Sequence, residues 1–330
     1  MSDQSSATAD TPVTVSDTRV IADAHPDAQA PVQAPVQAHA DAHAQALDAL
    51  TAFVREHPRL FILGGAGVST ESGIPDYRDA DGQRKGRDPI MLQDFLKSDL
   101  ARRRYWARNM IGWPTVARAK PNAAHRALAS LERLGHVERL VTQNVDGLHG
   151  EAGSSNVVEL HGNIGGVVCM SCGHRHTRAD IQIRLEADNP DWLAMHATPL
   201  PDGDARLESD RFDLFHAPGC ERCGGVIKPD VVFFGEGVPR SRVDDAMASL
   251  ARADAMLVVG SSLMVYSGFR FCEQAAKAGT PIAAINFGRT RADGLLSFKL
   301  PVSCGEILPA LIARLEGNSR MEFASIMAAS

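Results

Sequence analysis

Apolar residues along this chain gather in short, unbroken runs that alternate with stretches of helical periodicity. Helical spacing is clear in 122–135 and 267–279. Four of the apolar runs have strand character and are followed by glycine or polar residues: RLFIL (59–63), VERLVTQN (137–144), AMLVVGSS (255–262) and PIAAINF (281–287). Unbroken apolar runs suit strands that are covered on both faces, as in a parallel sheet. The pattern therefore predicts a doubly wound α/β fold, with its ligand site at the strand ends.

The first 45 residues differ in composition from the rest of the chain. They consist mainly of Ala, Asp, Gln, Pro, Thr and Ser, and they contain no Phe, Tyr or Trp. Such a segment buries too little apolar surface to offset its chain entropy, so we predict a disordered tail over 1–45. The first helix is expected to start near Asp41 and to end before Pro58.

The charge of the chain is concentrated in this tail. Its six Asp and one Arg contribute −5 of the formal net charge of −6, so the remainder is near neutral and has no basic field to attract nucleic acid. There is no apolar run of about 18 residues and no basic, apolar leader. We therefore expect no nucleic-acid or membrane partner and a cytoplasmic location.

Two insertions interrupt the alternation of strands and helices. Both must leave the sheet, and we expect them to stack as a smaller second domain, with the ligand cleft between the domains. The predicted organisation is a Rossmann-like core (46–78, 121–164 and 229–315, together within 46–315), a helical insert (79–120), a cysteine-containing module (165–228) and a C-terminal tail (316–330). The stretch from 189 to 210 is expected to be a surface excursion.

Four of the six cysteines form two CxxC pairs. Cys169 and Cys172 are separated by 47 residues from Cys220 and Cys223, and a glycine follows each pair. Four thiolates can surround one Zn²⁺ tetrahedrally and close its coordination shell, which predicts a structural metal. The alternative is a thioredoxin-like redox pair.

The stretch GGAGVSTESG follows the first predicted strand. Small residues at this point let backbone N–H groups approach a pyrophosphate at a helix N-terminus. It is not a regular GxGxxG, because Thr70 stands where the third glycine belongs. From these residues alone, nucleotide binding and a tight turn remain equally open.

Polar side chains crowd the end of the second predicted strand. Gln143, Asn144 and Asp146 lie in TQNVDGLHG, and His161 follows in ELHG. His161 alone is more simply a hydrogen-bonded structural histidine. Beside an acid and two amides in one cleft, a general base is favoured, because the ordinary pKa of histidine of about 6.5 suits that role near neutral pH.

The ordered set of motifs resembles the sirtuins, the NAD-dependent protein lysine deacylases. The motifs are GAGVSTESGIPDYR, TQNVDGLH, ELHG, the paired CxxC knuckles, KPDVVFFGE, GSSLMVYS and INFG, and the match runs from about residue 45 to 312. RYWARNMIGWP and the long spacer between the cysteine pairs are similar to the class II branch. The resemblance implies a Rossmann-like NAD-binding domain with a smaller domain made of a zinc ribbon and a helical insert. It also implies NAD and one structural Zn²⁺ as cofactors.

The resemblance further implies a set of contacts with NAD. Gly65, Ala66 and Gly67 would take the pyrophosphate, with Arg78 nearby, and the backbone at Cys304 would meet the adenine. Ile74 and Asp146 would hold the nicotinamide carboxamide, and Tyr77 would shield the reactive C1′. Gln143 and Asn144 would contact the ribose and an ordered water. The remaining implied NAD contacts are Asp76, Val145, Gly260, Ser261, Ser262, Asn286, Phe287 and Gly288.

In the mechanism that the resemblance implies, the acyl-lysine oxygen attacks C1′ as nicotinamide leaves and gives an alkylimidate. His161 then activates the ribose hydroxyls for attack on the imidate carbon, and O-acyl-ADP-ribose and the free lysine are released. Asn144 and Asp146 are the other catalytic residues that the resemblance implies. A strand-like segment, Val232, Phe233, Phe234, Gly235 and Glu236, would bind acyl-lysine proteins or peptides along their backbone. A purely structural strand is the alternative for this segment.

One departure concerns the acyl group. Relatives that remove succinyl or malonyl groups carry a Tyr and an Arg in the segment after PDYR. This chain has Arg84, Lys85 and Arg87 there but no Tyr, which disfavours an acidic acyl group. For these basic residues a contact with a carboxylate and a solvated loop both stay open, and the solvated loop is favoured. Two other functions stay open: protein mono-ADP-ribosyl transfer on the same scaffold, and a non-catalytic zinc module that senses NAD.

Overall fold

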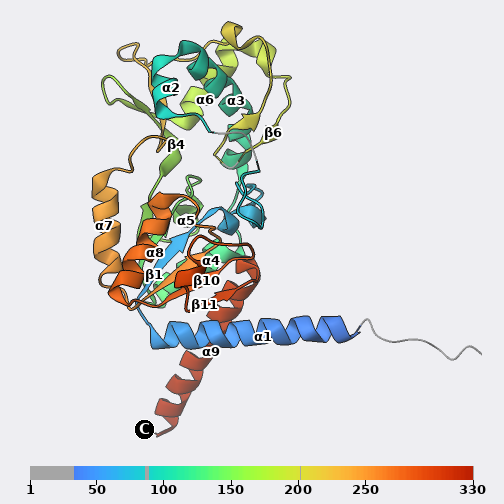
Figure 1. Cartoon of the computed structure of the whole chain (residues 1–330), viewed down its shortest axis with the longest axis vertical. Coiled ribbons are helices and arrows are strands. Elements are labelled where there is room, and N and C mark those ends of the chain that lie inside the picture. The colour runs from blue at the N-terminus through green and yellow to red at the C-terminus, as the bar shows by residue number, and fades with distance from the viewer. Residues whose placement is uncertain (1–32, 86–88, 201, 330) are drawn as a thin grey trace, which may run out of the picture. The chain divides into compact units, whose positions relative to one another are not determined.

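The computed structural model describes residues 33–85, 89–200 and 202–329 of the chain (Figure 1). Contacts divide the chain into two compact units, Met1–Ala40 and Asp41–Ser330. Every strand and all helices after the first belong to the second unit. Among the described residues, no helix has the length and apolar character needed to cross a membrane.

A six-stranded parallel sheet forms the centre of this unit. Its strand order is β11-β10-β9-β1-β2-β3. The strands are β1 (Leu60–Gly64), β2 (Val137–Thr142), β3 (Val157–Glu159), β9 (Ala255–Val259), β10 (Ile282–Ile285) and β11 (Phe298–Leu300). Each of the four predicted strands is present, and β1, β9 and β10 are buried at every position. The predicted doubly wound α/β fold is confirmed.

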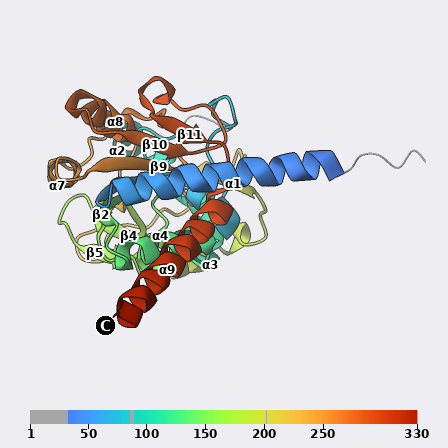
Figure 2. The ribbon, with the colours of Figure 1, turned by 90° about the horizontal axis from the view of Figure 1, so that it is seen from below.

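Helices cover both faces of the sheet, which explains why its strands are apolar on both sides. On one face, α1 (Gln33–Glu56), α4 (Ala123–Arg133) and α9 (Cys304–Ala329) contribute apolar side chains to one core with β1 and β9. On the other, α7 (Arg240–Leu250) and α8 (Tyr266–Ala278) form a second core. Figure 2 shows α8 and α9 on opposite sides of the strands.

Most residues of a third core come from the two insertions, and others, such as Ile74, Val145 and Leu148, come from outside them. Its largest buried side chains include Phe95, Trp106 and Phe215. Figure 1 shows α2, α3 and α6 close to one another beyond β4. The elements are α2 (Leu92–Lys97), α3 (Asp99–Arg118), β4 (Gly162–Cys169), β5 (Arg175–Thr177), α6 (Arg178–Asp188), β6 (Thr198–Pro199), β7 (Ala205–Arg206) and β8 (Ile227–Val231); the short α5 (Leu148–Glu151) follows β2.

The stretch from 189 to 210 is not a simple surface excursion. Trp192 is buried and stacks on Phe212, with the ring centroids 5.7 Å apart. Asp204 is buried and pairs with Arg108 of α3, with 2.9 Å between Arg108 Nε and Asp204 Oδ1. These contacts join the stretch to α3, a long-range packing that its polar composition does not reveal.

Parts of both predicted tails are helical in the structure. The helix α1 begins at Gln33, so 33–45 is helical, and α9 continues to Ala329, through 316–329. Alanine and glutamine dominate 33–45, and alanine, glutamate and methionine are frequent in 316–329. A proline is tolerated in the first turn of a helix, where Pro35 lies. The remainder of the predicted disordered tail, 1–32, lies outside the described residues.

Candidate functional site

The order of the sheet strands creates a crevice at their carboxyl ends. The chain proceeds from β1 to β2 and β3 on one side and from β9 to β10 and β11 on the other, so its direction reverses between β1 and β9. Loops after adjacent strands diverge at such a switch point and leave room for a ligand. The loop after β1 begins at Gly65 and the loop after β9 begins at Gly260, so the glycine-rich stretch lies at this point.

The glycines of these two loops pack directly against each other. A Cβ added to Gly65 would lie 2.6 Å from Ser261 Cβ, and one added to Gly67 would lie 2.8 Å from Gly260 Cα. Gly65 donates its N–H to Val259 O and Gly67 to Gly260 O. Those two N–H groups are therefore not available to a ligand. The two glycines instead allow the loops after β1 and β9 to pack closely, because a side chain at either position would clash.

Ala66 differs from its two glycine neighbours. Its N–H makes no hydrogen bond within the part of the chain that the structure describes. It lines a cavity of about 710 Å³, which is within the usual size range for ligand sites. Of the three backbone N–H groups at Gly65, Ala66 and Gly67, that of Ala66 is thus the one available to an anion without rearrangement.

The cavity brings together most of the predicted NAD and substrate residues. Ile74 and Asp146 do not line it, although both were predicted to hold the nicotinamide. The residues that do are Gly65, Ala66, Gly67, Asp76, Tyr77, Arg78, Gln143, Asn144, Val145, His161, Val232, Phe233, Phe234, Gly235, Glu236, Gly260, Ser261, Ser262, Asn286, Phe287, Gly288 and Cys304.

Asp146 instead belongs to a buried polar network behind the cavity. Its Oδ2 accepts a hydrogen bond of 2.7 Å from Ser69 Oγ, and its Oδ1 accepts the Leu148 N–H. Ser69 Oγ also lies 3.5 Å from His125 Nε2, and the His125 ring lies 4.8 Å from that of His149. Burial lowers the pKa of His125 to about 4 and that of His149 to about 3. Both rings are therefore neutral at pH 7.

The two amides that follow β2 connect the loops of the crevice. Gln143 Nε2 donates to Ser261 Oγ at 2.8 Å. Asn144 Nδ2 donates to Gly65 O at 3.1 Å and to Ser69 Oγ at 2.9 Å. The amide nitrogens thus bind the loops after β1 and β9 to the end of β2. The side-chain oxygens, Gln143 Oε1 and Asn144 Oδ1, make no hydrogen bond among the described residues, so both remain free to accept from a ligand.

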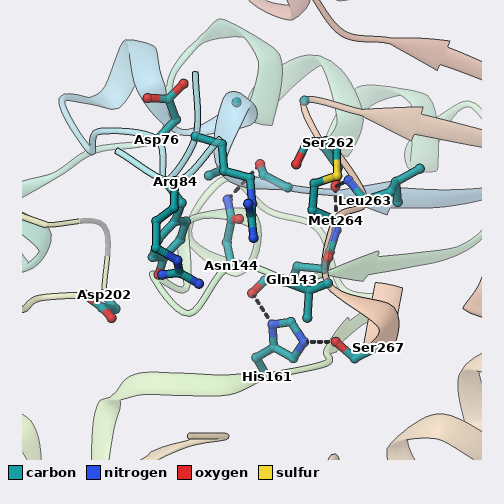
Figure 3. Close-up of a pocket in the computed structure, with 18 of the residues that line it drawn as sticks. Asp76, Arg84, Gln143, Asn144, His161, Asp202, Ser262, Leu263, Met264 and Ser267 are labelled. Carbon is teal, nitrogen blue, oxygen red and sulfur yellow. Dashed lines mark hydrogen bonds between the residues drawn. The ribbon is translucent and has the colours of Figure 1, made fainter. Parts of the chain in front are cut away.

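His161 lies at the edge of the cavity immediately before β4, and two hydrogen bonds hold its ring (Figure 3). Nδ1 lies 2.9 Å from the Gln143 backbone oxygen, and Nε2 lies 2.7 Å from Ser267 Oγ. Burial lowers the pKa of His161, and the hydrogen bond to the Gln143 carbonyl opposes this in part. The imidazole is therefore neutral at pH 7, as a general base must be.

The predicted substrate strand, 232–236, is mostly not a strand. β8 ends at Val231, and only Phe234 forms an isolated bridge, with Met91. The Glu236 side chain causes the change, because its Oε2 accepts the Phe233 N–H at 2.8 Å while the Glu236 N–H donates to Phe233 O. The segment turns at this point and still lines the cavity.

The four cysteines of the CxxC pairs converge as predicted. Their sulfurs all lie within 4.8 Å of one another, with Cys169 and Cys223 3.5 Å apart and Cys172 and Cys220 3.8 Å apart. A tetrahedral site with Zn–S bonds of about 2.3 Å separates its sulfurs by about 3.8 Å, so the arrangement fits one zinc ion, whereas a disulfide needs about 2.05 Å. Such an ion would hold the two knuckles together and has no ligand position left for catalysis.

Comparison with known proteins agrees with this architecture. A model of the Sir2 family matches residues 65–267. The chain is 57% identical to an NAD-dependent protein deacetylase of Xanthomonas campestris over 80% of its own length and 90% of the relative's. It is 55% identical to one of Bordetella bronchiseptica over 81% and 97%. The chain belongs to the Sir2 family.

Solved Sir2 structures share the fold. One described as "Sir2-p53 peptide-NAD+" has a TM-score of 0.65 at 29% identity, with 81% of this chain and 98% of that chain covered. Another, "Structural Basis for the Mechanism and Regulation of Sir2 Enzymes", has a TM-score of 0.64 at 31% identity, with 82% and 99% covered.

Several cavity residues of this Sir2 protein were not predicted as site residues. They include Glu71, Tyr105, Asp202, Asp204, Ser267, Arg270 and Ser303. Tyr105 is buried, and its ring lies 5.2 Å from that of Phe233. The motif RYWARNMIGWP contains Tyr105, and its aromatic residues indicated a packed helix, but no local signal placed that helix beside the substrate segment.

Proposed function

We propose that this Sir2 protein is an NAD-dependent protein deacetylase that transfers the acetyl group of a lysine side chain to ADP-ribose. The observation that supports this proposal most directly is the position of His161. Its neutral ring faces the same cavity as the loops after β1 and β9 and the segment 232–236. The names of its relatives in Xanthomonas and Bordetella support the same activity.

Each part of the cavity has a role in this proposal. The Ala66 N–H and the loops at Gly65 and Gly260 would receive the phosphates of NAD. Gln143 and Asn144 would orient the ribose through the free oxygens of their side-chain amides. His161 would take a proton from a ribose hydroxyl at Nε2 while its Nδ1–H stays on the Gln143 carbonyl. NAD would supply the electrophilic C1′ and nicotinamide as the leaving group.

The decisive experiment follows the products with purified protein, NAD and an acetyl-lysine peptide. Nicotinamide and O-acetyl-ADP-ribose should form only when both NAD and peptide are present. His161→Ala should lower formation of the second product at least 10²-fold, because it removes the base, while its melting temperature stays close to the parent's. NAD binding without nicotinamide release would support the non-catalytic alternative, and labelled protein without an acyl donor would support ADP-ribosyl transfer.

The preferred acyl group is the finer part of the proposal. Asp202 and Asp204 line the cavity, as do Arg84 and Lys85, and Asp204 pairs with Arg108. Because acidic and basic side chains offset one another here and the tyrosine of the succinyl- and malonyl-removing relatives is missing, we expect uncharged acyl groups to be favoured, in line with the acyl preference predicted from the sequence. Comparing acetyl, longer fatty, lipoyl and succinyl peptides tests this. Faster turnover of the succinyl peptide would contradict it.

The substrates in this proposal are acetylated proteins or peptides. A cytoplasmic site of action stays a prediction from the sequence alone.

A further inference from the structure

Ser267 occupies the catalytic face of His161. It lies in the first turn of α8, lines the cavity, and places Oγ 2.7 Å from His161 Nε2 (Figure 3). This is the shorter of the two hydrogen bonds on the ring, the other being the 2.9 Å contact from Nδ1 to the Gln143 oxygen.

The directions of both hydrogen bonds follow from their partners. A backbone carbonyl can only accept, so Nδ1 of His161 must carry the ring hydrogen and donate it to Gln143 O. In the neutral ring Nε2 then has a lone pair in the ring plane, and the Ser267 hydroxyl must donate to it. The lone pair that would receive the proton of a ribose hydroxyl is therefore already occupied.

We propose that Ser267 is a positioning residue that competes with the ribose hydroxyl for His161. Its hydroxyl holds the Nε2 lone pair in the free protein, and it must turn away before the base acts. This inference rests on the proposed deacetylase function, in which His161 is the base. During the step, the proton of the ribose hydroxyl moves to Nε2 and the ribose oxygen becomes the nucleophile. No proton passes through Ser267.

The expected change in rate when the Ser267 hydroxyl is removed follows from the strength of one hydrogen bond between neutral groups. The net value of such a bond corresponds to about a 2- to 12-fold effect on an equilibrium or a rate. A water that replaces the hydroxyl in Ser267→Ala would compete less well, since it must first be immobilised. We therefore expect the His161-dependent step to become about 2- to 12-fold faster in this variant.

The test compares two reactions of the same protein. Exchange of labelled nicotinamide into NAD in the presence of acetyl peptide depends on steps before His161 acts, whereas formation of O-acetyl-ADP-ribose requires the base. In Ser267→Ala the ratio of product formation to exchange should rise about 2- to 12-fold. The concentration of nicotinamide that halves deacetylation should rise with it.

Two further variants serve as matched controls. Ser267→Thr keeps the hydroxyl and should keep the parent ratio. Ser267→Cys replaces it with a weak S–H donor of similar shape and should shift the ratio in the direction of the alanine variant, which covers the case that alanine impairs folding.

Each other outcome contradicts the proposal. An unchanged ratio in both the alanine and cysteine variants would show that the hydroxyl does not compete. A lower ratio would show that Ser267 helps the base or carries the proton. Absence of both reactions in the parent protein would instead refute the proposed function, so the two failures are distinguishable.

Discussion

Lys228 and Glu236 form a buried ion pair on which the shape of the substrate segment depends. Lys228 is 4% exposed and Glu236 is 24% exposed, and Lys228 Nζ lies 3.0 Å from Glu236 Oε2. The ammonium also donates to Val231 O and lies 4.7 Å from the Phe233 ring centroid. The same carboxylate oxygen accepts the Phe233 N–H. One charge pair therefore holds both ends of the segment 232–236.

We predict that Glu236→Gln destabilises the protein by about 2–3 kcal/mol. The amide keeps an acceptor for the Phe233 N–H but leaves the Lys228 charge buried without its counter-charge. Breaking a fully buried pair in this way costs about 3–5 kcal/mol, and the partial exposure of Glu236 reduces the loss. For a chain of this size the melting temperature should fall by about 4–8 °C.

Thermal unfolding and steady-state kinetics measure the two consequences. The KM for the acetyl peptide should rise, because the segment loses its fixed turn, while the KM for NAD should stay the same. The double variant Lys228→Met with Glu236→Gln removes the stranded charge and should recover most of the lost stability. A melting temperature of Glu236→Gln within 1 °C of the parent's, or no recovery in the double variant, would refute the reasoning.

Three further changes have defined outcomes. Removing zinc with a chelator should lower the melting temperature, and an unchanged value after verified metal loss would contradict a structural site. Gly65→Ala should weaken NAD binding at least tenfold, because its Cβ would lie 2.6 Å from Ser261 Cβ, whereas Gly294→Ala meets open space and should bind normally in the same titration. The pKa of His149 in the folded protein is about 3, below the ordinary value of 6.5. Between these two pH values the unfolded chain therefore binds one more proton than the folded protein, and the free energy of unfolding falls as the pH decreases from 6.5 towards 3. His149→Phe should remove about 2 kcal/mol of this loss in urea unfolding between pH 7 and 5, because the unfolded histidine takes up its proton gradually around pH 6.5, and an identical pH dependence would contradict it.

The sequence determined those features that depend on neighbours along the chain. Four apolar runs were enough to predict the central strands, because each buried strand must be apolar on both faces. β3 and β11 were missed, since three residues carry too little pattern. The CxxC pairs predicted the zinc site from the ligand chemistry of cysteine, and the position of His161 after a polar strand end predicted a base.

Only the tertiary structure decided which groups face one another across long separations. The Gly65 and Gly67 N–H groups are engaged by Val259 and Gly260 at the end of β9. Asp146 bonds to a buried serine and does not line the cavity, and Glu236 turns the segment that was predicted to be a strand. Ser267 lies 106 residues from His161 along the chain and 2.7 Å from it in space. Hydrogen-bond partners of this kind are set by the packing of the sheet and its loops, and no local periodicity encodes them.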